Sequence, residues 1–161
     1  MADPIAQLLK AKESIVEDLR AFVEMESPSD DKRRTDEFGD FLSAFIKGRL
    51  DAHVEPITQP VYGNHLRVEV GPRNGRRPIL ILGHFDTVWP AGTLARMPFR
   101  VDGPFAYGPG ALDMKGGLVL GIHALGALQR ARVLQGPVVF LFTSDEELGS
   151  CLLYTSPSPR D

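Results

Sequence analysis

Three short segments contain the residue types that bind metal ions and transfer protons. Residues 83–88 read GHFDTV, residues 108–117 read GPGALDMKGG and residues 143–150 read TSDEELGS. A neutral imidazole such as that of His84 is a good zinc ligand. An acidic residue two positions later, Asp86, can hold the other ring nitrogen of that histidine. Alone, a His-x-Asp pair is more often structural, so its meaning depends on the other two segments.

The second segment is rich in glycine, which raises the alternative of a phosphate-binding loop. The spacing argues against that alternative, because GxGxxG would need glycine where Asp113 stands and no Gly-Lys-Ser/Thr follows. A carboxylate at this place would repel a phosphate but suit a cation, and its two oxygens can bridge two cations. Lys115, two residues later, is interpreted as structural rather than catalytic.

The third segment contains three adjacent carboxylates, those of Asp145, Glu146 and Glu147. Such groups repel one another unless something positive neutralises them. The plain alternative is a solvated acidic turn that caps a following helix. Histidine and carboxylate ligands without cysteine suit zinc or another divalent ion in a catalytic site.

All three segments lie at or just after the ends of predicted buried elements. Residues 78–82 and 137–142 are continuously apolar, which is typical of strands covered on both faces. The apolar stretch 116–131 between them predicts a helix, so the two strands are expected to be parallel members of one sheet. Open α/β folds build their sites at the carboxyl ends of parallel strands, and the three segments are expected to meet there.

The remaining elements are also marked by hydrophobic periodicity. A first helix is predicted from Pro4, capped by Asp3, to the SPS run at 27–29. A second helix is predicted to begin at Thr35, after the charged run 30–34, which is interpreted as a solvated loop. Its apolar face comprises Phe38, Phe41, Leu42, Phe45 and Ile46.

Two further strands are predicted at 54–58 and 65–70, the second of which alternates as a strand with one solvated face does. The pattern as a whole indicates an α/β fold, with a mixed sheet and flanking helices.

The bulk composition limits the class of protein. The 161 residues are 43% hydrophobic and 24% charged, which suits one domain or part of one. A net charge of −3 gives no general attraction to nucleic acid or to anionic membranes. No targeting segment is recognised, and the longest uncharged stretch, 116–129, has the length of a buried helix rather than of a membrane span. The predicted location is the cytoplasm.

The last segment, residues 151–161 (CLLYTSPSPRD), continues neither the helical nor the strand pattern. It is similar to the translation of a sequencing adapter, whereas the alternative is a genuine Ser/Pro-rich tail. We therefore expect authentic sequence to end near Ser150 and the single cysteine, Cys151, to carry no functional or redox information.

Taken together, the motifs resemble those of the M20 metallopeptidases, and most closely those of the glutamate carboxypeptidases. GHxDTV, GPGxxDMKGG and SDEELGS occur there in the same order and at similar separations, and EMESPS at 24–29 resembles the ending of the family's first helix. The resemblance covers residues 5–150. It implies a three-layer zinc-exopeptidase-like catalytic domain, of which residues 1–150 are the amino-terminal part.

The resemblance also implies a role for each residue that matches a family motif. His84 would bind one zinc ion, Asp113 would bridge two, and Glu147 would bind zinc through its carboxylate. Glu146 would be the general base, and Asp86 would orient His84. A complete site would hold two Zn²⁺ ions, with Co²⁺ or Mn²⁺ as alternatives, and the peptide bond after Asp113 would be cis.

The implied reaction is hydrolysis of an amide bond in a small peptide or an N-acyl amino acid. The family's other two ligands and its lid domain do not occur in these 161 residues. We therefore expect this chain to be inactive alone, to bind zinc weakly, and to belong to a homodimer formed through the lid domain. The other histidines, His53, His65 and His123, match no ligand motif and are interpreted as structural or surface residues.

Two alternatives stay open. A deacylase acting on acetylornithine or succinyl-diaminopimelate would use the same residues, and only the GPG wording at 108–110 favours the carboxypeptidase branch. A non-catalytic binding module of the same fold is the other alternative. The presence of the whole set of five site residues argues against it.

Overall fold

The computed structural model describes residues 3–150 of the chain. Its helices, including three short turns of helix labelled η, are α1 (Pro4–Lys10), α2 (Lys12–Glu24), α3 (Lys32–Lys47), η1 (Thr93–Ala95), η2 (Ala111–Lys115), α4 (Gly116–Arg130) and η3 (Glu146–Leu148). Its strands are β1 (Ala52–Ile57), β2 (His65–Val70), β3 (Ile79–His84), β4 (Arg100–Asp102), β5 (Phe105–Tyr107) and β6 (Val138–Thr143). The predicted tail and Cys151 lie outside the described residues.

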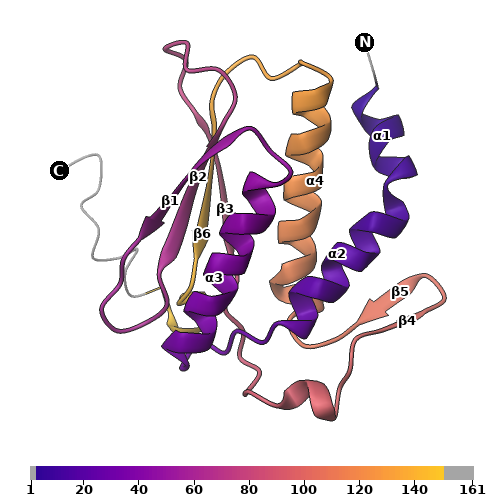
Figure 1. The fold of residues 1–161 in the computed structure, drawn as a ribbon, viewed down its shortest axis with the longest axis vertical. Helices are drawn as coiled ribbons and strands as arrows, with labels where there is room; N and C mark the ends of the chain where they lie inside the picture. The colour runs from indigo at the N-terminus through magenta and orange to yellow at the C-terminus, as the bar shows by residue number, and fades with distance from the viewer. Residues whose placement is uncertain (1–2, 151–161) are drawn as a thin grey trace.

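The first predicted helix is two helices, α1 and α2, with a break at Ala11. Its start is confirmed, since the Asp3 carboxylate accepts a hydrogen bond from the amide of Ile5 at 3.0 Å. At the break, the hydroxyl of Ser14 donates to the carbonyl of Ala11 at 2.8 Å. The chain changes direction between α1 and α2, as Figure 1 shows.

The second helix, α3, begins at Lys32, so the predicted start at Thr35 is wrong. The Asp31 side chain caps it by accepting from the amide of Arg34 at 3.1 Å. The charged run 30–34 is therefore the cap and first turn of a helix rather than a solvated loop. Thr35 is fully buried, and its hydroxyl lies within hydrogen-bonding distance of the carbonyls of Pro28 and Asp31.

The four long strands form one mixed sheet in the order β1-β2-β6-β3. Neighbours β1 and β2, and β2 and β6, are antiparallel, whereas β3 and β6 are parallel and are joined through α4. This confirms the predicted α/β class and the parallel pair. The prediction of β2 is confirmed to the residue, while β1 begins two residues before the predicted start at 54.

Helices α2, α3 and α4 lie on one side of the sheet (Figure 1). Their apolar faces form the core with alternate residues of β2 and β6, and its fully buried members include Phe22, Phe38, Leu42, Ile46, Leu118, Val119 and Phe142. Residues Ala111–Arg130 are long and apolar enough to span a membrane by length and composition alone. Because α4 packs its apolar residues into this core, core packing explains that composition.

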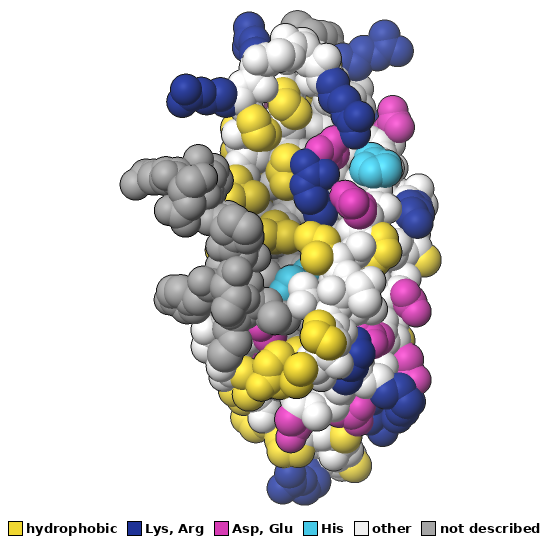
Figure 2. All heavy atoms as spheres, turned by 90° about the vertical axis from the view of Figure 1, so that its left-hand side faces the viewer, with side chains coloured by type: hydrophobic (Ala, Val, Ile, Leu, Met, Phe, Trp, Pro, Cys, Tyr) yellow, Lys and Arg dark blue, Asp and Glu magenta, His cyan; other side chains and the backbone are white. Residues whose placement is uncertain are grey.

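The opposite face of the sheet is only partly covered by the described residues. Leu80 and Leu82 of β3 are 61% and 54% exposed, and they pair with half-buried Val139 and Leu141 of β6. Hydrophobic side chains gather on this side of the molecule in Figure 2. Residues 79–82 are therefore covered on only one face by the part of the chain that the structure describes, which leaves hydrophobic surface open.

The core predicts one stability experiment, centred on Phe38. Its ring is fully buried, packs edge-on against Phe22 at 5.5 Å and stacks on Phe85 at 5.6 Å. Phe38→Ala should lower the free energy of unfolding by about 3 to 5 kcal/mol, because it removes these contacts and leaves a cavity. Urea titration followed by circular dichroism measures this change.

Leu112 provides the control, because it is 95% exposed. Leu112→Ala should leave the urea midpoint nearly unchanged. An equal loss in both variants would contradict the placement of Phe38 in the core.

Candidate metal centre

The register of two parallel strands brings the first and third motifs to one edge of the sheet. His84, the last residue of β3, pairs with Thr143, the last residue of β6. The chain leaves β6 through Ser144 and Asp145 into η3, which contains Glu146 and Glu147. The sheet edge that the sequence predicted as the site is therefore the place where these side chains meet.

The second motif reaches the same edge through the tight turn η2, which precedes α4. Gly110 starts the turn with a φ of 67°, and a Cβ there would lie 2.6 Å from the Thr87 side chain. Glycine is needed at this position because both the positive φ and the close approach exclude a side chain. The peptide bond between Asp113 and Met114 is cis, which confirms what the family resemblance implied.

His84, Asp113 and Glu147 form a group that could hold a metal ion. One donor atom from each lies within 4.8 Å of the others. The Nε2 atom of His84 is 3.1 Å from Oδ1 of Asp113 and 3.8 Å from Oε2 of Glu146. The His84 side chain is 6% exposed, whereas those of Asp113 and Glu146 are 73% and 50% exposed, so the group opens to solvent on its carboxylate side.

Asp86 lies behind this group and is fully buried. Its Oδ2 atom accepts from the Ser29 hydroxyl at 2.8 Å and from the Glu147 amide at 3.2 Å, and its Oδ1 atom accepts from the Glu146 amide at 3.2 Å. The same Oδ1 lies 3.4 Å from Nδ1 of His84. One carboxylate therefore links the imidazole, the Glu-Glu turn and the segment before α3.

Asp86 also influences the protonation of the group. Burial alone would lower the pKa of His84, but the hydrogen bond and charge of Asp86, with Asp113 and Glu146, raise it to about 9. Burial raises the pKa of Glu147, and the nearby carboxylates of Asp113, Asp86 and Glu146 add to the rise against the opposing effect of His84. The crowded carboxylates favour a positive charge among them, and in the protein alone the His84 imidazolium supplies it.

The sequence alone did not identify the residues that support the site's edge of the sheet through contacts with the segment before α3. The Ser27 hydroxyl donates to the Phe85 carbonyl at 2.6 Å, and the amide of Thr87 donates to the carbonyl of Ser27 at 2.9 Å. These contacts tie the segment before α3 to the chain that continues from β3. The EMESPS run at 24–29 was a sequence signal for them, but periodicity could not show what its serines contact.

Lys115 has the structural role that its sequence context indicated. It is 1% exposed, and its ammonium group donates to the carbonyls of Phe22 at 2.9 Å and Met25 at 2.7 Å, near the carboxyl end of α2. Burial lowers the pKa of Lys115 to about 7, against the opposing charge of Glu26. The lysine thus fastens the turn that carries Asp113 to the end of a core helix.

The other histidines do not join the metal-ligand group. His53 is exposed on β1, and His123 bonds Asp18 at 2.7 Å through its Nε2 atom. His65 is buried, with its Nδ1 atom 2.9 Å from the hydroxyl of Ser144. The interpretation of all three as structural or surface residues agrees with these positions.

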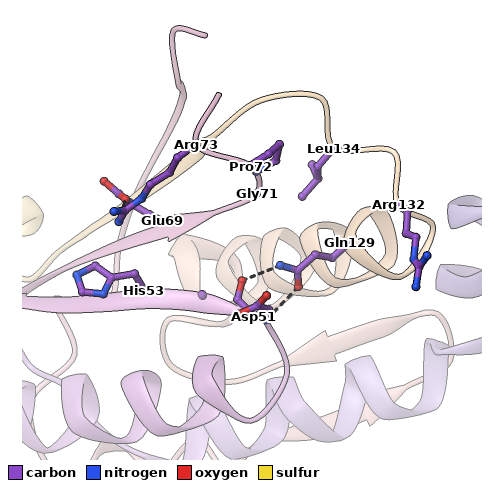
Figure 3. Close-up of a pocket in the computed structure, with 10 residues that line it drawn as sticks. Asp51, His53, Glu69, Gly71, Pro72, Arg73, Gln129, Arg132 and Leu134 are labelled. Carbon is purple, nitrogen blue, oxygen red and sulfur yellow. Dashed lines mark hydrogen bonds and ion pairs between the residues drawn. The ribbon is translucent and has the colours of Figure 1, made fainter. Parts of the chain in front are cut away.

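A separate hollow of about 590 Å³ lies at the other end of the sheet (Figure 3). Some of its polar groups bond one another. The backbone of Asp51 and the side chain of Gln129 exchange two hydrogen bonds, of 3.1 and 2.7 Å, and Arg73 bonds Glu69 at 2.5 Å. His53 and Arg132 also line it, but among residues 3–150 the set of metal ligands lies at His84, Asp113 and Glu147, which is therefore the better candidate for the functional site.

Comparisons with known proteins identify relatives of this sequence. Residues 80–157, which contain all five candidate site residues, match the sequence model of Peptidase family M20/M25/M40. Carboxypeptidase G2 of Pseudomonas sp. (strain RS-16) is 34% identical over 139 residues, which cover 85% of this chain and 33% of that protein. A succinyl-diaminopimelate desuccinylase of Methylorubrum extorquens is 36% identical over 127 residues, covering 70% of this chain and 32% of the relative.

The fold agrees as well. The solved structure of the di-peptidase Dug1p from Saccharomyces cerevisiae superposes with a TM-score of 0.77 at 18% identity, covering 93% of this chain and 36% of that chain. By its sequence, the chain belongs to the M20 peptidase family. It spans about a third of the length of the curated relatives that it matches.

A loop beside the centre is fastened by Glu26. Its two carboxylate oxygens accept the amides of Gly92 at 2.7 Å and Leu94 at 3.0 Å, and the Arg34 guanidinium lies 3.9 Å away. Burial would raise the pKa of Glu26, but the amides and Arg34 outweigh it and hold the pKa below its ordinary value of 4.5. The ionised carboxylate therefore stabilises the fold.

This contribution should depend on pH. Because the folded pKa of Glu26 is the lower one, the stabilisation is present above pH 4.5 and is lost as the pH falls through the folded pKa. Glu26→Gln should cost about 1 to 3 kcal/mol at pH 7, since hydrogen bonds to a charged acceptor are lost. The difference in unfolding free energy between the unsubstituted chain and Glu26→Gln, measured by urea titration, should be smaller at pH 3 than at pH 7.

Glu37→Gln is the matched control, because Glu37 is a half-exposed carboxylate on α3 paired with Arg33. It should change the unfolding free energy little at either pH. A Glu26→Gln gap that stays constant from pH 7 to pH 3 would contradict the lowered pKa.

Proposed function

We propose that this chain forms the amino-terminal part of the catalytic domain of a metal-dependent hydrolase of the carboxypeptidase type. The substrate would be a peptide or N-acyl amino acid, cleaved at an amide bond. The main support is that one donor atom each from His84, Asp113 and Glu147 lie within 4.8 Å of one another, beside the carboxyl ends of two parallel strands. Carboxypeptidase G2, at 34% identity, supports the reaction type.

The residues present fit a divalent cation. One imidazole and two carboxylates, without a thiolate, are the donor types of catalytic zinc sites, and they also suit Co²⁺ or Mn²⁺. Burial raises the pKa of Glu147, and the nearby carboxylates of Asp113, Asp86 and Glu146 raise it further, so a cation held among these carboxylates would favour their ionised forms. When bound, zinc lowers the pKa of water and polarises a carbonyl group. We infer two ions in the complete site, with Asp113 between them.

Glu146 is the residue that we assign as general base. Its carboxylate is half exposed and faces the opening of the group, 3.8 Å from the His84 ring, while its backbone amide is held by Asp86. A carboxylate in this position can accept a proton from the attacking water and pass it to the leaving nitrogen. Glu147, its neighbour, belongs to the donor group instead, which supports the division of roles between the two glutamates.

Asp86 would position the group rather than touch the substrate. Its side chain is fully buried and contacts both His84 and the Glu146–Glu147 turn. Both the backbone carbonyl of Asp86, 3.1 Å from Nδ1 of His84, and its carboxylate, 3.4 Å from the same atom, favour the orientation in which Nε2 points at the cation. Partners of this kind are typically worth about 10- to 100-fold in metal affinity.

Cobalt titration of the 161-residue chain tests the ligand assignment. The chain should bind Co²⁺ with a change in visible absorption, and His84→Ala, Asp113→Ala or Glu147→Ala should each weaken binding about 100-fold or more, since loss of a ligand exceeds loss of a supporting partner. Glu146→Ala and His53→Ala should bind as the unsubstituted chain does. If cobalt binding survives Glu147→Ala but not Glu146→Ala, Glu146 is the ligand and Glu147 the candidate base. If the unsubstituted chain binds no cobalt, the proposed metal centre is wrong.

Activity requires a complete protein, because the chain spans 33% of carboxypeptidase G2. In a chimera, residues 1–150 would replace the matching segment of that relative. The chimera should release glutamate from an N-acyl glutamate. Glu146→Ala should lower kcat of the chimera by about 10²- to 10⁴-fold while its metal content stays unchanged. Retained turnover in that variant would contradict the base assignment.

A second candidate is favoured by the desuccinylase relative at 36% identity. Hydrolysis of an N-succinyl amino acid would use the same five residues. Assaying the chimera in parallel with N-succinyl-diaminopimelate tests whether this amino-terminal part permits that reaction.

A further inference from the structure

His65 is buried next to the candidate centre although it belongs to no motif. It is 4% exposed and is the first residue of β2. Because β2 runs antiparallel to β6, the start of β2 lies beside the end of β6, where the chain turns toward Glu146 and Glu147. The topology therefore places this imidazole against the backbone that carries the proposed base and ligand.

The Nδ1 atom of His65 holds the first residue of that segment. The amide of Ser144 lies in position to donate to it at 3.1 Å, and the hydroxyl of Ser144 lies 2.9 Å from the same atom. Because a donated amide hydrogen requires an unprotonated Nδ1, we assign the proton of the neutral ring to Nε2. The hydroxyl of Ser144 bonds the carbonyl of Gly63, two residues before His65. A Cβ on Gly63 would lie 2.5 Å from the Thr35 side chain and 3.2 Å from Cβ of Ser144, so this backbone is packed closely.

The Nε2 atom of His65 faces the second residue of the segment. It lies 3.8 Å from Oδ1 of Asp145, whose carboxylate is fully buried. Nε2 has no hydrogen-bond partner among residues 3–150, although it is buried. Burial lowers the pKa of His65, against the opposing charges of Asp145 and Asp86, and this favours the neutral ring that Nδ1 requires.

The two ends of the segment are thus held from different sides. His65 contacts Ser144 and Asp145, whereas Asp86 accepts the amides of Glu146 and Glu147 at 3.2 Å each. Two buried side chains thus accept the backbone amides of three of these four residues, Ser144, Glu146 and Glu147. A hydrocarbon side chain could fill the space of His65, but it could not accept the Ser144 amide.

We propose that His65 is a positioning residue that fixes the backbone of residues 144–147, and through it the carboxylates of Glu146 and Glu147. This role rests on the proposed function for its catalytic meaning. Its structural part concerns the turn alone and can be measured without metal.

The test compares His65→Leu, which keeps an apolar volume without nitrogens, with His65→Asn, whose side-chain oxygen can accept the Ser144 amide. His53→Asn, at the exposed histidine on β1, is the matched control. NMR of the 161-residue chain gives the tautomer of His65 and the amide hydrogen exchange of residues 144, 146 and 147. Cobalt titration then gives the metal affinity.

We expect a protonated Nε2 and a bare Nδ1 in the unsubstituted chain. His65→Leu should speed exchange at the three turn amides at least about tenfold while the β6 amides keep their rates, and should weaken cobalt binding about 10- to 100-fold. His65→Asn should recover part of the protection at Ser144, and His53→Asn should change neither quantity.

Three outcomes would overturn the proposal. One is the opposite tautomer, with the proton on Nδ1. Another is His65→Leu with unchanged exchange at the turn and unchanged cobalt affinity. The third is an equal loss of protection across the whole sheet in His65→Leu, which marks general destabilisation rather than a hold on the turn. If the unsubstituted chain binds no cobalt, the proposed function fails, while the exchange pattern alone still supports or refutes the hold on the turn.

Discussion

The arrangement of the centre depends on one buried carboxylate. Asp86 is fully buried, and it accepts hydrogen bonds from Ser29 and from the amides of Glu146 and Glu147 while lying against His84. A buried ionised group is costly unless donors surround it, so the fold can keep this carboxylate only by keeping those partners in place. The pKa of Asp86 is lowered despite its burial, because the bonds from His84, Ser29 and the Glu147 amide favour the ionised form.

Side chains from several distant parts of the sequence support the metal-ligand group and its surroundings. Ser29 precedes α3, His65 begins β2, and Lys115 fastens the Asp113 turn to the end of α2. None of these residues belongs to the proposed donor group. The ligands themselves come from the β3–α4–β6 unit, and the segments before it supply most of the contacts that orient them.

The sequence predicted best the elements whose signals are local. An uninterrupted apolar run marks β6, strict alternation marks β2, and the five candidate site residues stand in motifs that follow the predicted elements. The break at Ala11 and the start of α3 at Lys32 were missed, because a serine hydroxyl and an aspartate cap compete with periodicity at those points. The hydrophobic run at 78–82 marks β3 as a strand but does not say what covers its second face, where Leu80 and Leu82 are exposed.

The metal-ligand group likewise has features that the local sequence predicts and contacts that it does not. His84, Asp113 and Glu147 could be named from residue type and spacing, but the amides that Asp86 accepts and the ring nitrogens of His65 could not. Such contacts join residues some 60 to 80 positions apart and involve backbone atoms, which carry no side-chain signature.

The parallel register of β3 and β6 also limits where this family of sequences can vary in length. A one-residue insertion within Ile79–His84 would turn the inward side chains of the strand outward and move His84 about 3.3 Å along it, away from Thr143. The alternation of side chains along β3 therefore fixes both which residues face the core and where the proposed ligand His84 lies. Insertions and deletions should occur instead in the loops 71–78 and 131–137, at the opposite end of the sheet. There they would change neither the side-chain alternation of β3 nor the position of His84.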